Sequence, residues 1–171
     1  MNSSKLYLVN HLVRVLPDTR CFALKRGLYR WCGVSIGQHV RICSSVRIIG
    51  GGKLSIGDNT WIGHDFMIVA SAGVTIGADV NIAPRSFIGT GTHAIDVDGS
   101  ASAGRGVSLP VVIEDGAWLC ACCTIIAGKR VGRKSIVGAG ACVVSDVPPM
   151  EVWGGVPARR IKSLEECKGK E

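Results

Sequence analysis

The chain has 171 residues, of which 20 are Lys or Arg and 13 are Asp or Glu, so its net charge is +7, and only 5% of it is aromatic. This length predicts one domain with a sizeable core. The positive charge favours an anionic partner, such as an acidic lipid surface or a phosphate-rich cofactor. Because aromatic residues that could stack on bases are scarce, we expect no nucleic-acid partner.

Cysteine and glycine are frequent, with 8 and 23 residues. No CxxC pair is present, and the densest group, Cys120, Cys122 and Cys123, has poor spacing for a tetrahedral metal site. Met1–Lys5 leads into a short apolar stretch interrupted by charge, which is not typical of a signal peptide. We therefore expect reduced thiols in a cytoplasmic protein, and no metal. The glycines lack the every-third spacing of collagen, so we expect them in turns.

Residues 1–33 are predicted to form a helical cap, with a break at Pro17-Asp18. The apolar face of the first helix would be Leu6, Leu8, Val9, Leu12, Val13 and Leu16. The apolar side of the second would be Cys21, Phe22, Leu24, Leu28 and Tyr29, and the basic residues are Arg14, Arg20, Lys25, Arg26 and Arg30. Two compatible interpretations stay open. The helices cover one end of the domain, or they also touch anionic lipid at the inner face of the membrane.

Residues 34–147 carry a repeat in which aliphatic residues recur at six-residue spacing. The stations are Ile36, Ile42, Ile48, Ile56, Ile62, Ile68, Ile76, Ile82, Ile88, Ile113, Leu119, Ile125, Val131, Val137 and Val143. This period matches neither a helix nor a plain strand, but it fits a short strand followed by a turn. Three such units close one triangular coil, so the fifteen stations predict an all-β solenoid, a parallel β-helix of about five coils. The extra residues at Gly50–Lys53 and Ala70–Gly73 should bulge at one corner.

The repeat fails once, between Ile88 and Ile113, which predicts an excursion loop over residues 90–110. Long loops on rigid scaffolds are often functional. This loop carries His93, whose imidazole is the best candidate for a general base. Asp96 or Asp98 could orient the imidazole, or both could be solvated loop carboxylates.

Residues 148–171 are predicted to be a C-terminal extension. Pro148-Pro149 should stop the coil, since proline cannot donate to a strand ladder. Arg159–Cys167 is predicted to form a short terminal helix.

The [LIV]-G-x4 units from about Val34 to Val144 resemble the hexapeptide-repeat acyltransferase family over about two thirds of the chain. The resemblance implies a left-handed β-helix and a homotrimer whose active sites lie between subunits. Gly91–Asp96 is similar to the start of the histidine-containing loop in sugar O-acetyltransferases of this family. There the histidine is the general base, which implies that role for His93.

The second block resembles the acetyl-CoA segments of the family, over Ile113–Ala121, Val137–Pro149 and Gly155–Ile161. The resemblance implies acetyl-CoA as the acyl donor. It also implies that the Ala121 backbone N–H stabilises the oxyanion. Trp118 would pack beside the thioester or the pantetheine arm.

The same resemblance places further residues against the cofactor. The Ala139 backbone would contact pantetheine, and Arg159 and Lys162 would bind the phosphates of CoA. Val144 and Ser145 occupy the cofactor-facing positions at which the family has other residues, including a lysine, so one cation is missing here.

The acceptor is less constrained. Gly63 and Ser71 stand where galactoside-type members have an Asn and an Asp, which argues against the same acceptor. Asp65 and Asp96 are the candidates for contacts with a different sugar. The start of the chain looks like that of members that decorate surface polysaccharides, whose acceptors are often lipid-linked glycans.

Taken with the resemblance, the sequence predicts an O-acetyltransferase that acts on a sugar hydroxyl in surface polysaccharide or glycoconjugate biosynthesis. One alternative is N-acetylation of an amino sugar or transfer to serine. A zinc-dependent γ-type carbonic anhydrase would need a close pair of histidines, which the chain lacks. A structural, non-enzymatic β-helix would predict rows of Thr or Asn and no excursion loop.

Overall fold

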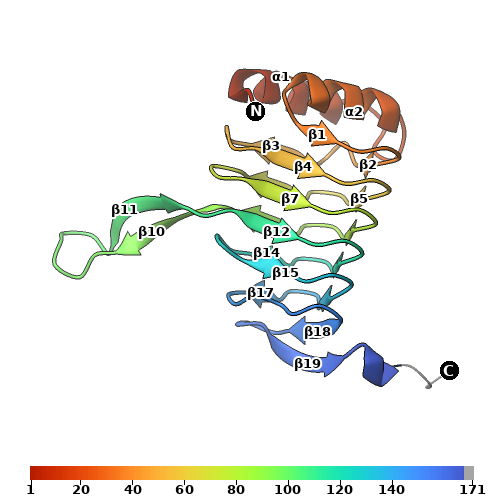
Figure 1. The fold of residues 1–171 in the computed structure, drawn as a ribbon. Coiled ribbons are helices and arrows are strands. Elements are labelled where there is room, and N and C mark those ends of the chain that lie inside the picture. The colour runs from red at the N-terminus through yellow and green to blue at the C-terminus, as the bar shows by residue number, and fades with distance from the viewer. Residues whose placement is uncertain (168–171) are drawn as a thin grey trace.

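A computed structural model describes residues 1–167 as a left-handed parallel β-helix with two helices across one end (Figure 1). The predicted stations stack in register. Ile36 lies opposite Ile56, Ile56 opposite Ile76, and Ile76 opposite Ile113 in the next coil. The predicted solenoid is therefore confirmed.

The β-helix has three faces, each a parallel sheet. The first contains β1 (Ser35–Ile36), β4 (Leu54–Ile56), β7 (Val74–Ile76), β12 (Val111–Ile113) and β15 (Arg130–Val131). The second contains β2 (Arg41–Ile42), β5 (Trp61–Ile62), β8 (Asn81–Ile82), β13 (Trp118–Leu119), β16 (Ile136–Val137) and β18 (Glu151–Gly154), with β19 (Arg159–Ser163) added antiparallel at the edge. The third contains β3 (Arg47–Ile49), β6 (Met67–Val69), β9 (Phe87–Gly89), β14 (Thr124–Ile125) and β17 (Cys142–Val143).

The inward-pointing residues form the core. Ile62, Ile82 and Leu119, which stack on one another, are each 0% exposed. Burying an aliphatic side chain of this size contributes about 1.5–3 kcal/mol. The column can form only when several coils stack, because each coil leaves its interior open above and below.

Two corners of the prism position the functional residues. The Ala121 corner consists of the turns that follow β2, β5, β8, β13 and β16, at residues 43–46, 63–66, 83–86, 120–123 and 138–141. The hairpin corner consists of the segments that follow β3, β6, β9, β14 and β17, at residues 50–53, 70–73, 90–110, 126–129 and 144–146. The predicted bulges lie at the hairpin corner. There a Cβ on Gly52 would collide with the Ala72 carbonyl, so the close stacking of the bulged turns requires glycine.

The predicted excursion is a β-hairpin that projects away from the coils at mid-height (Figure 1). It is formed by β10 (Gly91–Ile95) and β11 (Ala103–Ser108), which pair antiparallel. Its base is closed, because the Leu109 N–H donates to the Thr90 carbonyl over 2.8 Å. The hairpin can therefore leave the β-helix without displacing the coils on either side.

The N-terminal helices α1 (Ser3–Arg14) and α2 (Phe22–Trp31) lie over the first coil (Figure 1). Leu6, Val9 and Val13 of α1 are buried, as expected, but Leu8 and Leu12 are about half exposed. The predicted inner face of α2 is confirmed at Tyr29, which is buried, but it is wrong in two other respects. Leu24 is 52% exposed, and Lys25, which was expected among the basic surface residues, is buried.

Contacts with the preceding turn and with Phe22 compensate for the burial of Lys25. Its ammonium group donates to the carbonyls of Pro17 and Asp18 over 3.0 and 2.6 Å and lies above the Phe22 ring. Burial lowers the pKa of this amine below its usual value. No helix in residues 1–167 is long and apolar enough to cross a membrane.

The β-helix continues one partial turn beyond the five predicted coils. Val147 pairs with Val131, and β18 pairs with β16. The expected terminal helix at Arg159–Cys167 is wrong over its first part. Residues Arg159–Ser163 form β19, which returns antiparallel along β18, and only the 3₁₀ turn η1 (Glu165–Cys167) is helical. Residues 168–171 of the predicted C-terminal extension lie outside the described part of the chain.

Candidate acyl-transfer site

His93 lies on β10, and its side chain is exposed. The register of the hairpin places it opposite Gly106, and its Nδ1 is 2.8 Å from the Gly104 carbonyl oxygen. A carbonyl can only accept, so Nδ1 carries the proton in this hydrogen bond. The other ring nitrogen, Nε2, is then unprotonated in the neutral imidazole, which is the form that a general base requires.

The carboxylate of Asp96 does not orient His93. Its Oδ1 accepts from the backbone N–H groups of Asp98 and Gly99 over 3.1 and 2.9 Å, and so closes the turn at the tip of the hairpin. The orientation of the imidazole comes from the Gly104 carbonyl instead, a group that local sequence does not reveal. Within residues 1–167, Asp98 makes no hydrogen bond or ion pair with His93 either.

Ala121 and Ala139 occupy equivalent places in successive coils at the Ala121 corner, where the Gly140 N–H donates to the Ala121 carbonyl over 2.8 Å. The Ala121 N–H donates to no backbone carbonyl of residues 1–167. Among the described residues this N–H is therefore available to donate a hydrogen bond to an oxyanion. Ala139 is exposed, which leaves its backbone accessible to a ligand along the same corner.

Trp118 begins β13, three residues before Ala121, and is 49% exposed on the outer surface of the second face. It lines a shallow hollow together with Asn81, Ile136 and Leu164. Lys134 also lines this hollow, which is open to solvent and can accept part of a long ligand.

Arg159 and Lys162 both lie on β19, with exposed side chains. Arg160 between them is engaged, because it donates to Glu151 over 3.0 Å and to Glu166 over 3.1 Å. Hydrogen bonds from the Trp153 indole and the Arg160 guanidinium hold the pKa of Glu151 below its usual value. Arg159 donates one guanidinium N–H to the Ala158 carbonyl over 2.8 Å, so its other N–H groups and the Lys162 ammonium are the donors that a phosphate could reach.

Val144 and Ser145 lie at the hairpin corner, directly after β17. They are therefore on a different edge of the prism from Ala121 and Ala139. Asp65 is an exposed residue at the Ala121 corner, and its backbone N–H donates to the Ser45 hydroxyl over 3.0 Å.

The predicted site residues are thus divided between two edges of one chain. Ala121, Ala139 and Asp65 lie at the Ala121 corner, whereas His93 belongs to β10. The hairpin formed by β10 and β11 projects away from the coils (Figure 1). One chain alone does not bring the expected base to the expected oxyanion donor.

Thr90, at the root of the hairpin, is a residue that sequence reasoning missed. It is fully buried, and its hydroxyl accepts from the Ser71 and Ala72 N–H groups over 2.8 and 2.9 Å and donates to the Val69 carbonyl. One feature of the sequence could have indicated this role, because Thr90 stands where the repeat fails. A threonine hydroxyl at such a place can form hydrogen bonds with the backbone of a turn.

Comparisons with known proteins show what the chain is similar to. No protein-family model matches the chain. Over 148 residues it is 32% identical to WcaF of Escherichia coli (strain K12), which is named as a colanic acid biosynthesis acetyltransferase, and the match covers 82% of this chain and 79% of WcaF. It is 30% identical over 132 residues to galactoside O-acetyltransferase of the same organism, covering 77% of this chain and 64% of that protein. The match to an acetyltransferase of Saccharomyces cerevisiae, YJL218W, is 36% identical but spans only 59% of that protein and 68% of this chain.

Solved structures show the same architecture. The hexapeptide-repeat acetyltransferase VCA0836 of Vibrio cholerae, in complex with acetyl-CoA, matches with a TM-score of 0.76 and 27% identity over 95% of this chain and 86% of that one. Galactoside acetyltransferase in complex with coenzyme A matches with a TM-score of 0.75 over 95% of this chain and 80% of that one, and its 23% identity supports the fold alone.

A left-handed β-helix with these relatives defines an acyltransferase, and the expected enzyme class is confirmed. The chain belongs to the hexapeptide-repeat acetyltransferase family.

Proposed function

We propose that this chain transfers an acetyl group from acetyl-CoA to a sugar hydroxyl in the biosynthesis of a surface polysaccharide. A relative named for colanic acid biosynthesis and another named for galactosides support a carbohydrate acceptor. A structural relative in complex with acetyl-CoA supports the donor.

The observation that carries the proposal is the hydrogen bond from His93 Nδ1 to the Gly104 carbonyl. It leaves Nε2 free to take the proton of the acceptor hydroxyl. The oxygen then attacks the thioester carbonyl, and the Ala121 N–H stabilises the oxyanion of the tetrahedral intermediate. Collapse of this intermediate breaks the C–S bond, and the imidazolium returns the proton to the departing CoA thiolate.

The donor would lie along the Ala121 corner. The thioester would sit beside Ala121, the pantetheine arm along Ala139 and Trp118, and the phosphates beside Arg159 and Lys162. Both cations belong to β19, whose pairing with β18 fixes them to the coil, so they can bind phosphate without a large loss of backbone entropy.

The active unit would be a homotrimer. The division of the site between two edges supports this, because a neighbouring copy can bring its hairpin corner, with His93, Val144 and Ser145, against the Ala121 corner of this chain. A prism with three flat faces suits closed cyclic assembly. Asp65, exposed at the Ala121 corner, would then face the acceptor between two copies.

Subunit complementation tests this arrangement. The variant His93→Ala lacks the base, and Ala139→Trp blocks the cofactor corner, so each alone should be inactive. Co-refolded mixtures should regain activity, since some interfaces then combine an intact hairpin with an intact corner. Mixtures that stay inactive, while each variant still assembles, would contradict a shared site.

The direct test is CoA release from acetyl-CoA with a panel of sugars and amino sugars. We expect His93→Ala to lower kcat by about 10²–10⁴-fold, the contribution of a general base. His39→Asn is the matched control, because His39 has a φ of 56°, which Asn tolerates, and lies on the other side of the coil from the hairpin. Unimpaired turnover in His93→Ala would refute the assigned base, and faster turnover of amino sugars would favour N-acetylation.

The helical cap also supports a peripheral contact with anionic lipid at the inner face of the membrane. Residues 1–57 contain nine Lys or Arg and one Asp, a net charge of +8, whereas residues 58–171 contain eleven and twelve, a net charge of −1. Tyr7, Leu12, Val15 and Trp31 of the cap are 46–82% exposed. Exposed apolar groups within a basic surface are the composition of an interfacial contact, and such a contact would bring the enzyme to a lipid-linked acceptor.

A further inference from the structure

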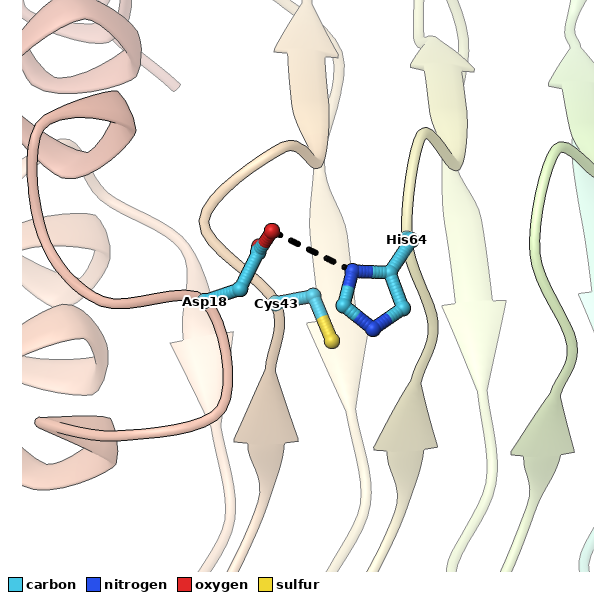
Figure 2. A group of neighbouring side chains, drawn as sticks. All are labelled: Asp18, Cys43 and His64. Atoms are coloured by element: carbon cyan, nitrogen blue, oxygen red, sulfur yellow. Dashed lines mark ion pairs between the residues drawn. The ribbon is translucent and has the colours of Figure 1, made fainter.

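Three side chains with metal-binding atoms meet beneath the helical cap, outside the acyl-transfer residues. Asp18 comes from the turn between α1 and α2, Cys43 from the turn after β2, and His64 from the turn after β5 (Figure 2). A carboxylate oxygen, the thiol sulfur and an imidazole nitrogen all lie within 4.8 Å of one another. The donor atoms of three side chains that bind one metal ion must lie at about this distance from one another.

The carboxylate is held in place before any ligand binds. Asp18 Oδ1 accepts from the backbone N–H groups of Ser44 and Ser45 over 2.7 and 3.1 Å. These bonds direct Oδ2 to His64, whose Nδ1 is 3.3 Å away. On the other side, Lys25 donates to the carbonyls of Pro17 and Asp18 and so fixes the backbone of the turn.

The thiol of Cys43 is the unusual member of the group. Its residue is 0% exposed, and the sulfur points toward the imidazole of His64 (Figure 2). Within residues 1–167 this sulfur makes no hydrogen bond, in contrast to Cys123 at the same corner, whose sulfur donates to the Cys120 carbonyl. The Cys43 sulfur is thus a buried polar atom directed into the cluster without a partner.

We propose that Asp18, Cys43 and His64 bind one divalent transition-metal ion of the zinc type, with water as the fourth ligand. Sulfur, imidazole and carboxylate together suit Zn²⁺, and hard ions such as Mg²⁺ do not favour a thiolate. On binding, the Cys43 thiol releases its proton to solvent, and the thiolate and the carboxylate offset the charge of the ion.

The surroundings leave a path for the ion. The side chains of Asp18 and His64 are 44% and 40% exposed, so one side of the cluster opens to solvent, where the water ligand would lie. The three ligands belong to the cap and to the first and second coils. A bound ion would therefore join the cap to the β-helix by three coordinate bonds.

This site is independent of acetyl transfer, and it departs from our expectation of no metal. Cys43 and His64 are 21 residues apart, one coil plus one residue, and Asp18 lies outside the repeat. No local sequence motif therefore indicates this metal site.

Titration of the metal-stripped chain with Co²⁺ and Zn²⁺ tests the inference. We expect one equivalent to bind and Co²⁺ to develop a thiolate-to-metal absorption band. Cys43→Ser should remove the band and weaken Zn²⁺ binding by at least about 100-fold, since loss of a hydrogen bond to a ligand alone costs about 10–100-fold. Cys122→Ser, which changes an exposed thiol away from the cap, should leave both unchanged.

Asp18→Asn provides a second variant, because its amide oxygen can still accept from Ser44 and Ser45 while the charge is lost. Its melting temperature without metal shows whether the cap is intact. It should bind Zn²⁺ more weakly and lose the increase in melting temperature that Zn²⁺ gives the parent chain. Absence of stoichiometric binding to the parent, or equal loss of the band in Cys43→Ser and Cys122→Ser, would overturn the site.

Discussion

At the scale of single residues, Thr90 links the hairpin to the coils. Its hydroxyl satisfies two backbone N–H groups in the bulge at residues 71–72. We expect Thr90→Val to lower the free energy of unfolding by about 1–3 kcal/mol, because both donors are left unpaired. Thr90→Ser keeps the hydroxyl and should cost less. Urea denaturation measures the free energy of unfolding of both variants. Equal stability of the Val and Ser variants would contradict this role of Thr90.

Cys123 gives the protein a dependence of stability on alkaline pH. Burial raises the pKa of this thiol from its ordinary value of 9.0 to about 12. Between these values the unfolded chain loses the proton while the folded chain keeps it. The free energy of unfolding should therefore be unaffected by this thiol below pH 9 and fall as pH rises from 9 toward 12.

The variant Cys123→Ser isolates this contribution. A serine hydroxyl can still donate to the Cys120 carbonyl, but it does not ionise in this range. Denaturation at several pH values should show a smaller alkaline decline for the variant than for the parent chain. An identical decline in both would assign it to other groups, such as Tyr29, whose pKa burial also raises.

At this scale, the place of a residue in the fold was predictable where it follows from the repeat, and not where it follows from tertiary contacts. His93 was correctly placed on an excursion because the spacing fails there, whereas its role as a base stays a prediction. The burial of Lys25 could not, because its partners are two carbonyls of the preceding turn. The same reason hides the carbonyl of Gly104 as the group that orients His93.

At the scale of elements, the hairpin is separable from the scaffold. Its ends meet through the hydrogen bond from Leu109 to Thr90, so residues 91–108 can be replaced by two glycines without stretching the chain. We expect the shortened protein to fold, with a melting temperature within a few degrees of the parent, and to lose CoA release. Circular dichroism and the CoA assay measure these quantities.

The control for this excision is His93→Ala, which should lose turnover to a similar extent with the hairpin in place. Both proteins should still be stabilised by acetyl-CoA, since the proposed contacts of Ala121, Ala139 and Arg159 remain. Turnover that survives the excision would show that the base lies elsewhere.

The secondary-structure elements were predictable where their own residues carry a sequence pattern. Each core station was placed by the six-residue spacing, but the second inward residue of β4, β7 and β12, at Leu54, Val74 and Val111, was not. The partial sixth turn was missed because Pro148-Pro149 interrupts the period before β18. The error at β19 has a different cause, since this strand depends on pairing with β18 and not on a pattern within its own residues.

At the scale of the whole molecule, positive charge is concentrated at one end. The net charge of +8 in residues 1–57 belongs to the cap and the first coil, whereas the acyl-transfer residues lie in the near-neutral remainder. In a cyclic trimer with parallel β-helix axes, three caps would face the same way. Once one cap has bound the membrane, the other two caps of the trimer would be held close to it, so the trimer would bind more tightly than a single cap.

Vesicle co-sedimentation tests this arrangement with anionic and zwitterionic lipids. We expect the protein to bind anionic vesicles and to be released as salt is raised, since the Debye length shrinks from about 30 Å at 0.01 M to about 8 Å at 0.15 M. Replacing Leu12 and Val15 by Glu should weaken binding at least about tenfold. The change removes apolar area that the membrane would bury, and it places two negative charges on the protein against the anionic lipid surface. Val97→Glu, at the exposed hairpin tip, is the matched control. Equal binding to both lipids, or equal loss in the control, would assign the basic end to another partner.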